Sequence, residues 1–274
     1  MRPERAMRAR VASLPMYLAN RPAVAALWEL LRKALNAAGM ERLPAQLTWP
    51  QDYHRHWLEP DLLLSQTCGF PLTHALAGQV QLVGCFSYDA PQCEGIYCRS
   101  VLVARSEHAH WALERFRGLR VAFNAQDSQS GTNALRALVA PLARKGVFFA
   151  RTLETGAHIA SVAAVRNGQA DLAAIDCVTF AALQRCTPQA TQGLCTVGTT
   201  DAYPGLPLVT ALATSAAERV QLQQALHALV AMPQAATTLE TLGISGFDTP
   251  TLSVYQRCAD MRESARALGY PALA

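Results

Sequence analysis

Hydroxyl-bearing residues and a glycine follow the apolar run RVAFN at residues 120–124. They are Ser128, Ser130, Gly131 and Thr132, and a helical pattern of apolar residues begins at about the last of them. The first turn of a helix carries unsatisfied N–H donors and a partial positive charge, so it favours a bound anion. The alternative is an ordinary helix N-cap, with Ser130 capping its own helix and nothing bound.

A second stretch, LLLSQTCGFPLTHAL at residues 62–76, repeats this arrangement in the first half of the chain. An apolar run typical of a buried strand leads into Thr67, Cys68 and Gly69, where a helix is expected to start. Two ordinary capped helices remain the alternative. Two such helix starts, one in each half, nevertheless favour a ligand site.

A third stretch, residues 155–183, carries His158 at an expected helix start and Asp176 at the end of the apolar run DLAAI. The histidine could donate to an anion or could be structural. The aspartate could contact a ligand or cap the next helix. If Cys68 or Cys177 lay beside His158, a Cys–His pair could act as a nucleophile, so an enzyme is a rival hypothesis.

The chain has eight cysteines and no C-x-x-C pair, so the spacing typical of zinc or thioredoxin-type chemistry is missing. We therefore expect no metal site and no cofactor. Cys93 and Cys98 are close enough in sequence to form a disulfide if the protein is exported. The alternative for most of the cysteines is a role as small buried hydrophobic residues.

Strand-like and helix-like stretches alternate along the chain, which favours parallel sheets flanked by helices. In such sheets ligands bind at the carboxyl ends of strands, where helices begin. We expect strands at 10–18, 46–49, 61–65, 81–86, 101–104, 120–124, 171–175 and 206–214. We expect helices from Pro22 to Gly39, from about Thr132 to Pro141, and at 158–168, 177–184, 220–232 and 252–268.

The amino-acid composition excludes several classes of protein. The 274 residues are 51% hydrophobic, which allows a sizeable core and excludes a disordered chain. The net charge of +4 is scattered, and no Arg/Lys stripe suggests nucleic-acid binding. No apolar run approaches the ~18 residues of a membrane-spanning helix.

The N-terminus superficially resembles a signal peptide, because arginines precede the apolar residues 11–19. Ser13, Pro15 and Tyr17 interrupt that stretch, so we expect a first strand there. The sequence as it stands then indicates a cytoplasmic protein. A periplasmic location would follow if residues preceded this start.

Four stretches resemble the phosphate/phosphonate substrate-binding proteins of ABC transporters. FRGLRVAFNAQDSQSGTNAL and TGAHIASVAAVRNGQADLAAIDCVTF look like the second lobe of that family, and LSQTCGFPL and YDAPQCEGIYCRSVLVAR like the first. The resemblance covers most of residues 10–214. It implies an α/β, two-lobed type 2 periplasmic-binding-protein fold, in which each lobe is a mainly parallel sheet flanked by helices. Lobe 1 would be residues 1–103 plus 206–274 and lobe 2 residues 104–205, joined by crossing segments at 101–105 and 206–210.

The resemblance also implies a function: a monomer, not an enzyme, that clamps a small phosphorus oxyanion or phosphonate between its lobes and has an ABC-transporter permease as its partner. The implied ligand residues are Thr67, Cys68 and Gly69 in lobe 1, Ser128, Ser130, Gly131, Thr132 and His158 in lobe 2, and Tyr17 and Tyr97 as walls. The alternatives are an enzyme on the same fold and a cytosolic ligand-sensing module whose hydrophobic tail helices bind a protein partner.

Two positions depart from the family pattern. Ala125-Gln126-Asp127 stands where the family usually has Asp-Pro before its Ser-x-Ser-Gly, and Ala157 stands where a hydroxyl residue often precedes the histidine. No carboxylate is clearly placed for a substrate ammonium. Phosphate or a smaller oxyanion is therefore expected in preference to a 2-aminoalkyl phosphonate.

Overall fold

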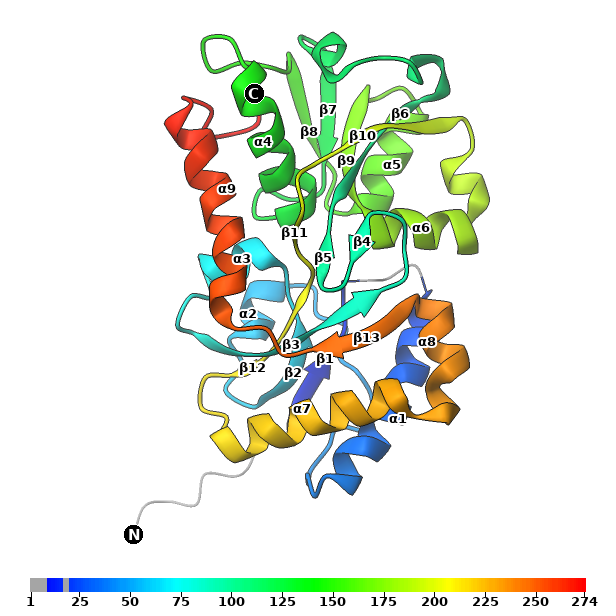
Figure 1. The fold of residues 1–274 in the computed structure, drawn as a ribbon, viewed down its shortest axis with the longest axis vertical. Coiled ribbons are helices and arrows are strands. Elements are labelled where there is room, and N and C mark those ends of the chain that lie inside the picture. Colours follow the sequence, from blue (N-terminus) through cyan, green and yellow to red (C-terminus); the bar gives the residue numbers. More distant parts are fainter. Residues whose placement is uncertain (1–8, 17–19) are drawn as a thin grey trace. The chain divides into compact units, whose positions relative to one another are not determined.

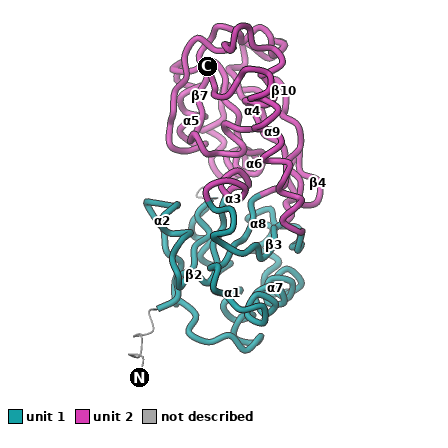
Figure 2. Tube along the Cα trace, turned by 90° about the vertical axis from the view of Figure 1, so that its left-hand side faces the viewer, with its two compact units in different colours: residues 1–67, 76–86, 206–250 teal, residues 68–75, 87–205, 251–274 magenta. Residues whose placement is uncertain are grey.

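A computed structural model describes residues 9–16 and 20–274 of the chain. Its contacts divide the chain into two compact units, coloured separately in Figure 2. Unit 1 comprises residues 1–67, 76–86 and 206–250, and unit 2 comprises residues 68–75, 87–205 and 251–274. Each unit therefore gathers three separate segments of chain.

Unit 1 is built on a five-stranded sheet in the order β1-β2-β12-β3-β13. The strands are β1 (Val11–Ser13), β2 (Leu62–Gln66), β3 (Val80–Tyr88), β12 (Pro207–Ala211) and β13 (Ile244–Asp248). Its helices are α1 (Arg21–Ala37), α2 (Tyr53–Trp57), α7 (Ala216–Ala231) and α8 (Ala236–Leu242), and α1 packs against α7 and α8 (Figure 1).

Helix α1 forms as its sequence predicts. The Asn20 side chain caps the N-terminus by accepting the N–H of Ala23, and a proline stands in the first turn. Gly39, at φ +81°, follows the last turn in the left-handed conformation that favours glycine. The buried face includes Leu27 and Leu31, at the predicted helical spacing.

Two strand predictions in unit 1 need correction. The strand expected over 10–18 covers only Val11–Ser13 among the described residues, and residues 46–49 form no strand. There, the N–H and the hydroxyl of Thr48 both donate to the carbonyl of Ala12, at 2.7 and 3.1 Å. This segment therefore contacts the first strand at one residue without forming a ladder.

Unit 2 contains a five-stranded sheet in the order β10-β6-β9-β7-β8 and a small sheet in the order β11-β5-β4. The strands are β4 (Cys93–Glu94), β5 (Tyr97–Cys98), β6 (Ser100–Arg105), β7 (Arg120–Phe123), β8 (Arg151–Glu154), β9 (Leu172–Asp176), β10 (Leu194–Thr199) and β11 (Tyr203–Pro204). The helices are α3 (Gly69–Thr73), α4 (Ala134–Val139), α5 (His158–Arg166), α6 (Cys177–Cys186) and α9 (Gln256–Ala267). Helix α9 lies beside α4 (Figure 1).

The sheets are mixed, which corrects the prediction that each is mainly parallel: each large sheet contains a strand that runs antiparallel to both neighbours. β12 is antiparallel to β2 and β3, and β6 is antiparallel to β9 and β10, whereas β7 is parallel to β8 and β9. A parallel connection needs a long crossover, usually a helix. β12 instead begins where the chain returns to unit 1, and β6 follows the β4–β5 hairpin, so helix–strand alternation alone does not predict their direction.

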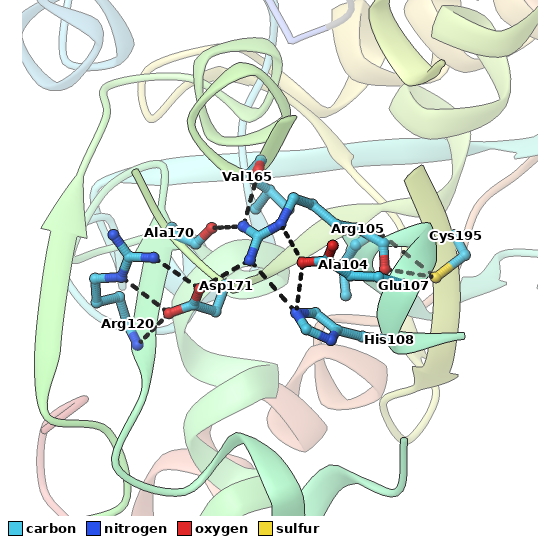
Figure 3. Close-up of polar contacts among 9 residues, drawn as sticks. All are labelled: Ala104, Arg105, Glu107, His108, Arg120, Val165, Ala170, Asp171 and Cys195. Atoms are coloured by element: carbon cyan, nitrogen blue, oxygen red, sulfur yellow. Dashed lines mark hydrogen bonds and ion pairs between the residues drawn. The ribbon is translucent and has the colours of Figure 1, made fainter. Parts of the chain in front are cut away.

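A buried carboxylate links three strands of the larger sheet in unit 2. Asp171, just before β9, accepts from Arg120 at the start of β7, with the backbone N–H at 3.0 Å, Nε at 2.9 Å and Nη2 at 2.8 Å. Arg105, at the end of β6, donates to it at 3.3 Å (Figure 3). Burial opposes ionisation of Asp171, but the Arg120 hydrogen bonds and charge outweigh it and lower the pKa to about 2. The cluster is structural, because these partners occupy both carboxylate oxygens.

The predicted lobe boundaries stay a prediction, since the compact units group some segments differently. Residues 68–75, 87–103 and 251–274 belong to unit 2, whereas the predicted first lobe contained them, including Cys68 and Gly69. The expected crossing segments, 101–105 and 206–210, lie in strands β6 and β12. Within the described part of the chain, no helix combines the length and apolarity that a membrane span requires.

Candidate anion-binding site

The first helix start of unit 2 follows β7. A π-helical turn, Gln129–Asn133, continues directly into α4. The Oγ of Ser128 accepts the N–H of Gly131 at 3.0 Å, and its carbonyl accepts the N–H of Asn133 at 2.9 Å. Ser128 is therefore the N-cap, so the alternative in which Ser130 caps this helix is wrong.

Gly131 sits where the helix start meets the end of β7. A Cβ at this position would lie 1.9 Å from Oδ1 of Asn124 and 3.2 Å from Cε1 of His158. The Oδ1 atom is buried and has no hydrogen-bond partner in the described structure. A glycine is thus needed here for close packing, and an unpartnered acceptor lies beside it.

The second helix start follows β8, which pairs with β7. Beyond the strands, Gly156 donates its N–H to the carbonyl of Asn124 at 2.8 Å and has φ +83°. Helix α5 then begins at His158, whose Nε2 lies 2.7 Å from Oγ of Ser130. The two helix starts therefore meet in one serine–histidine pair.

His158 is neutral at physiological pH, because burial lowers its pKa to about 4. Its Nδ1 is buried and has no hydrogen-bond partner among the described residues. A neutral imidazole and a serine hydroxyl carry two hydrogens, and their mutual bond uses one. If Ser130 donates, the remaining hydrogen is on the buried Nδ1 of His158; if His158 donates, it is on Oγ of Ser130, which also lies 3.5 Å from Oγ of Ser128.

The other predicted residues of unit 2 make hydrogen bonds or close packing contacts within the unit. The Thr132 hydroxyl already donates to the carbonyl of Ala125 at 2.6 Å. Cys68 Sγ accepts the N–H of Gln129 at 3.2 Å, and burial raises the pKa of this thiol to about 11. A Cβ at Gly69 would lie 2.7 Å from Sγ of Cys258, so this glycine also serves packing.

The remaining predicted residues lie apart from this pair or outside the described structure. Thr67 belongs to unit 1, where its N–H donates to the carbonyl of Pro207 at 2.9 Å and its buried hydroxyl has no described partner. Tyr97 lies on β5 with 43% of its surface exposed. Tyr17 lies outside the described residues. Ligand contact by any of them stays a prediction.

Asp176 caps α6, which is one of the two roles predicted for it. Its Oδ1 accepts the N–H of Thr179 at 2.8 Å. Burial, followed by the neighbouring Cys177, raises the pKa of Asp176 to about 7. Ligand contact by this carboxyl group stays a prediction.

The Cys–His pair of the rival enzyme hypothesis does not form in the described structure. Cys68 bonds Gln129, Cys177 Sγ contacts Cys93 Sγ, and His158 bonds Ser130. The Ser130–His158 pair was not expected from the sequence. It lacks a group that orients the histidine through Nδ1, and a pKa of about 4 makes the imidazole a weak base.

No cluster of three or more His, Cys, Asp or Glu side chains suited to a metal occurs among the described residues.

Comparison with known proteins identifies the family. Residues 86–255 match the model of the periplasmic substrate-binding proteins of phosphonate ABC transporters. The chain belongs to this family. No curated protein sequence matches it significantly.

Solved structures share the fold. The chain is similar to the binding-protein component of an ABC phosphonate transporter from Pseudomonas aeruginosa, with 17% identity, a TM-score of 0.76, and coverage of 96% of this chain and 88% of that one. PhnD1 from Prochlorococcus marinus, in complex with methylphosphonate, gives 14% identity, a TM-score of 0.74, and coverage of 94% and 97%. A Xanthomonas citri protein bound to ATP gives 13% identity, a TM-score of 0.71, and coverage of 96% and 98%.

These comparisons confirm the predicted family, the two-lobed type 2 periplasmic-binding-protein fold and a ligand-binding role without catalysis. The family is described as periplasmic, so the cytoplasmic placement is not supported. The oligomeric state stays a prediction.

Proposed function

We propose that this phosphonate-family protein binds a small phosphonate or phosphate through the helix starts before α4 and α5. The observation that carries the proposal is the 2.7 Å contact between Ser130 Oγ and His158 Nε2, which joins two helix N-termini and involves only one of the two hydrogens that the pair carries. Helix N-termini favour anions through their unpaired N–H groups and their partial positive charge.

The donors at this site are divided between internal bonds and the ligand. Cys68 and Ser128 already accept the N–H groups of Gln129 and Gly131. The N–H groups of Ser130 and Thr132 belong to the same first turn, where helix geometry supplies no internal acceptor. We assign these two N–H groups and the spare hydrogen of the Ser130–His158 pair to the anion.

The ligands of two similar structures support recognition of a phosphorus–oxygen group. Methylphosphonate and ATP differ in size and share only phosphorus-bound oxygens as a recognisable anion. We infer that this chain binds that group in the same way, delivers its ligand to an ABC-transporter permease and works in the periplasm, as its family is described.

Calorimetric titration with methylphosphonate, phosphate and phosphite tests the proposal. Ser130→Ala removes a hydroxyl, and a hydrogen bond to a charged group is worth ~1.5–3 kcal/mol. We expect at least a tenfold loss of affinity, which corresponds to ~1.4 kcal/mol.

Ser215→Ala is the matched control. Ser215 caps α7 in unit 1 by accepting the N–H of Glu218 at 3.1 Å. Its loss should lower the stability by ~1 kcal/mol and leave affinity unchanged. If Ser130→Ala also lowers only the melting temperature, Ser130 is a structural residue and the anion assignment is wrong.

A further inference from the structure

Three cysteines of unit 2 meet at the first turn of α6. Cys177 is the first residue of that helix, and its Sγ lies 3.4 Å from Sγ of Cys93 on β4. Cys98 on β5 also hydrogen-bonds Cys177. The ladder of the β4–β5 hairpin places Cys93 directly opposite Cys98, so the hairpin presents two thiols to the helix.

The three thiols differ in exposure. Cys177 and Cys98 are 2% and 6% exposed, whereas Cys93 is half-buried. A dissolved oxidant therefore reaches the cluster at Cys93. The two buried sulfurs can react only with a neighbour.

Cys177 is also the most acidic of the three. Hydrogen bonds from Cys93 and then Cys98 lower its pKa, and the first position of a helix acts in the same direction. The Cys93–Cys177 hydrogen bond, together with burial, raises the pKa of Cys93. Cys177 is thus the thiol suited to attack a sulfur of Cys93 after that sulfur has reacted.

We propose that Cys93 and Cys177 form a disulfide when the protein meets a disulfide oxidant, and that this bond ties the β4–β5 hairpin to the start of α6. The two sulfurs need to approach from 3.4 Å to about 2.05 Å. The periplasm, where the family is located, is an oxidising compartment in which such bonds persist. The inference does not depend on the identity of the ligand.

The reaction is a thiol–disulfide exchange with a small-molecule or protein disulfide, RSSR. Cys93 loses its thiol proton and attacks RSSR, which forms a mixed disulfide and releases one RS⁻. The Cys177 thiolate then attacks Cys93 Sγ, forms the internal disulfide and releases a second RS⁻. The two protons lost by the cysteines convert both RS⁻ groups to thiols. The protein is oxidised by two electrons and RSSR is reduced by two.

Oxidised glutathione and peptide mapping test the proposal in the full chain. Cys186 is exposed and would form glutathione adducts, so the test uses a Cys186→Ser background. Oxidation should remove two titratable thiols, link the Cys93 and Cys177 peptides, and be reversed by dithiothreitol. The thiol count and the peptide map are read on protein that retains both cysteines, so they do not rely on the folding of cysteine variants.

Cysteine variants separate the partners. Cys98→Ser should still give the Cys93–Cys177 crosslink, whereas Cys93→Ser and Cys177→Ser should each abolish it. A Cys93–Cys98 crosslink, loss of the crosslink in Cys98→Ser, or full retention of thiols after oxidation would each overturn the proposal.

Discussion

The Ser130–His158 pair connects residues that are 28 positions apart in the sequence and only 2.7 Å apart in space. Its chemistry depends on an uncharged imidazole, and burial provides this by lowering the pKa of His158 to about 4. A neutral histidine keeps a single ring hydrogen. The direction of the hydrogen bond with Ser130 therefore determines which of the two side chains keeps a hydrogen outside that bond.

The depressed pKa of His158 makes stability depend on pH. An unfolded histidine has a pKa of ~6.5, so the unfolded chain binds more protons between that pH and about 4. The contribution of His158 to stability is complete above pH ~6.5 and is lost as pH falls through that window. Urea unfolding at several pH values should show that His158→Gln loses this part of the pH dependence.

The experiment compares the pH profile of the variant with that of the wild type. This is needed because titration of Asp176 changes the stability in the opposite direction over an overlapping pH range. Burial raises the pKa of Asp176 to about 7, so its contribution is complete below the unfolded value and is lost as pH rises towards 7. If His158→Gln and the wild type keep identical pH profiles between 4 and 6.5, the imidazole is not buried in a neutral form.

The sequence predicts the residue types of the site but not its contacts. Hydroxyl and glycine residues beside an apolar run indicate helix starts, so Ser130 and His158 could be named. Their contact depends on the β7–β8 register and on hydrogen bonds such as Gly156 N–H to the Asn124 carbonyl. Asn124 itself was missed, because its importance comes from the close approach of Gly131.

At the scale of elements, Asp171 holds strands β6, β7 and β9 together. Asp171→Asn keeps the shape and removes the charge that Arg105 and Arg120 contact. The Arg120 side chain is 40% exposed, so solvent screens part of the interaction. We expect a loss of ~1–2 kcal/mol of unfolding free energy at pH 7, measured by urea denaturation.

The pH window and a control make this prediction specific. The pKa of Asp171 is lowered to about 2, so its contribution is present above the unfolded value of ~3.9 and is lost as pH falls through 2. The difference between the variant and the wild type should therefore shrink as pH falls below ~3.9 and vanish only below pH 2. Asp201→Asn removes an exposed ion pair with Arg257 and should change little at any pH. Equal effects of the two substitutions at pH 7 would contradict a structural role for Asp171.

Elements with a strong apolar pattern were predicted, and those without one were missed. Helix α1 and strands β2, β7 and β9 follow their patterns closely. Strand β8, with sequence RTLE, has all four residues exposed and therefore carries no apolar signal. It lies at the edge of its sheet, where pairing with β7 rather than burial defines it as a strand.

For the whole molecule, ligand binding should appear as thermal stabilisation. A ligand at 100 times its Kd adds ~2.7 kcal/mol to the free energy of unfolding, which corresponds to a shift of several degrees for a chain of this size. We expect methylphosphonate to raise the melting temperature and acetate at equal ionic strength to have no effect. Calorimetric melts of the wild type and Ser130→Ala check this, and the variant should show a smaller shift.

An equal rise with acetate would indicate a general salt effect instead of a phosphonate site. Closure of the two lobes on an anion, which the family resemblance implies, stays a prediction.

The division of unit 2 into three segments has a consequence for biosynthesis. Its core joins Phe116, Leu135 and Phe148 from the middle of the chain with Ala265 and Tyr270 from α9 and the residues after it. A nascent chain emerging from the ribosome can form the central sheet early. It cannot complete that core until residues 251–274 have been translated, so apolar surface beside α4 stays uncovered during elongation. A chaperone that recognises exposed apolar segments would be able to bind this surface until α9 has been translated and packs against α4.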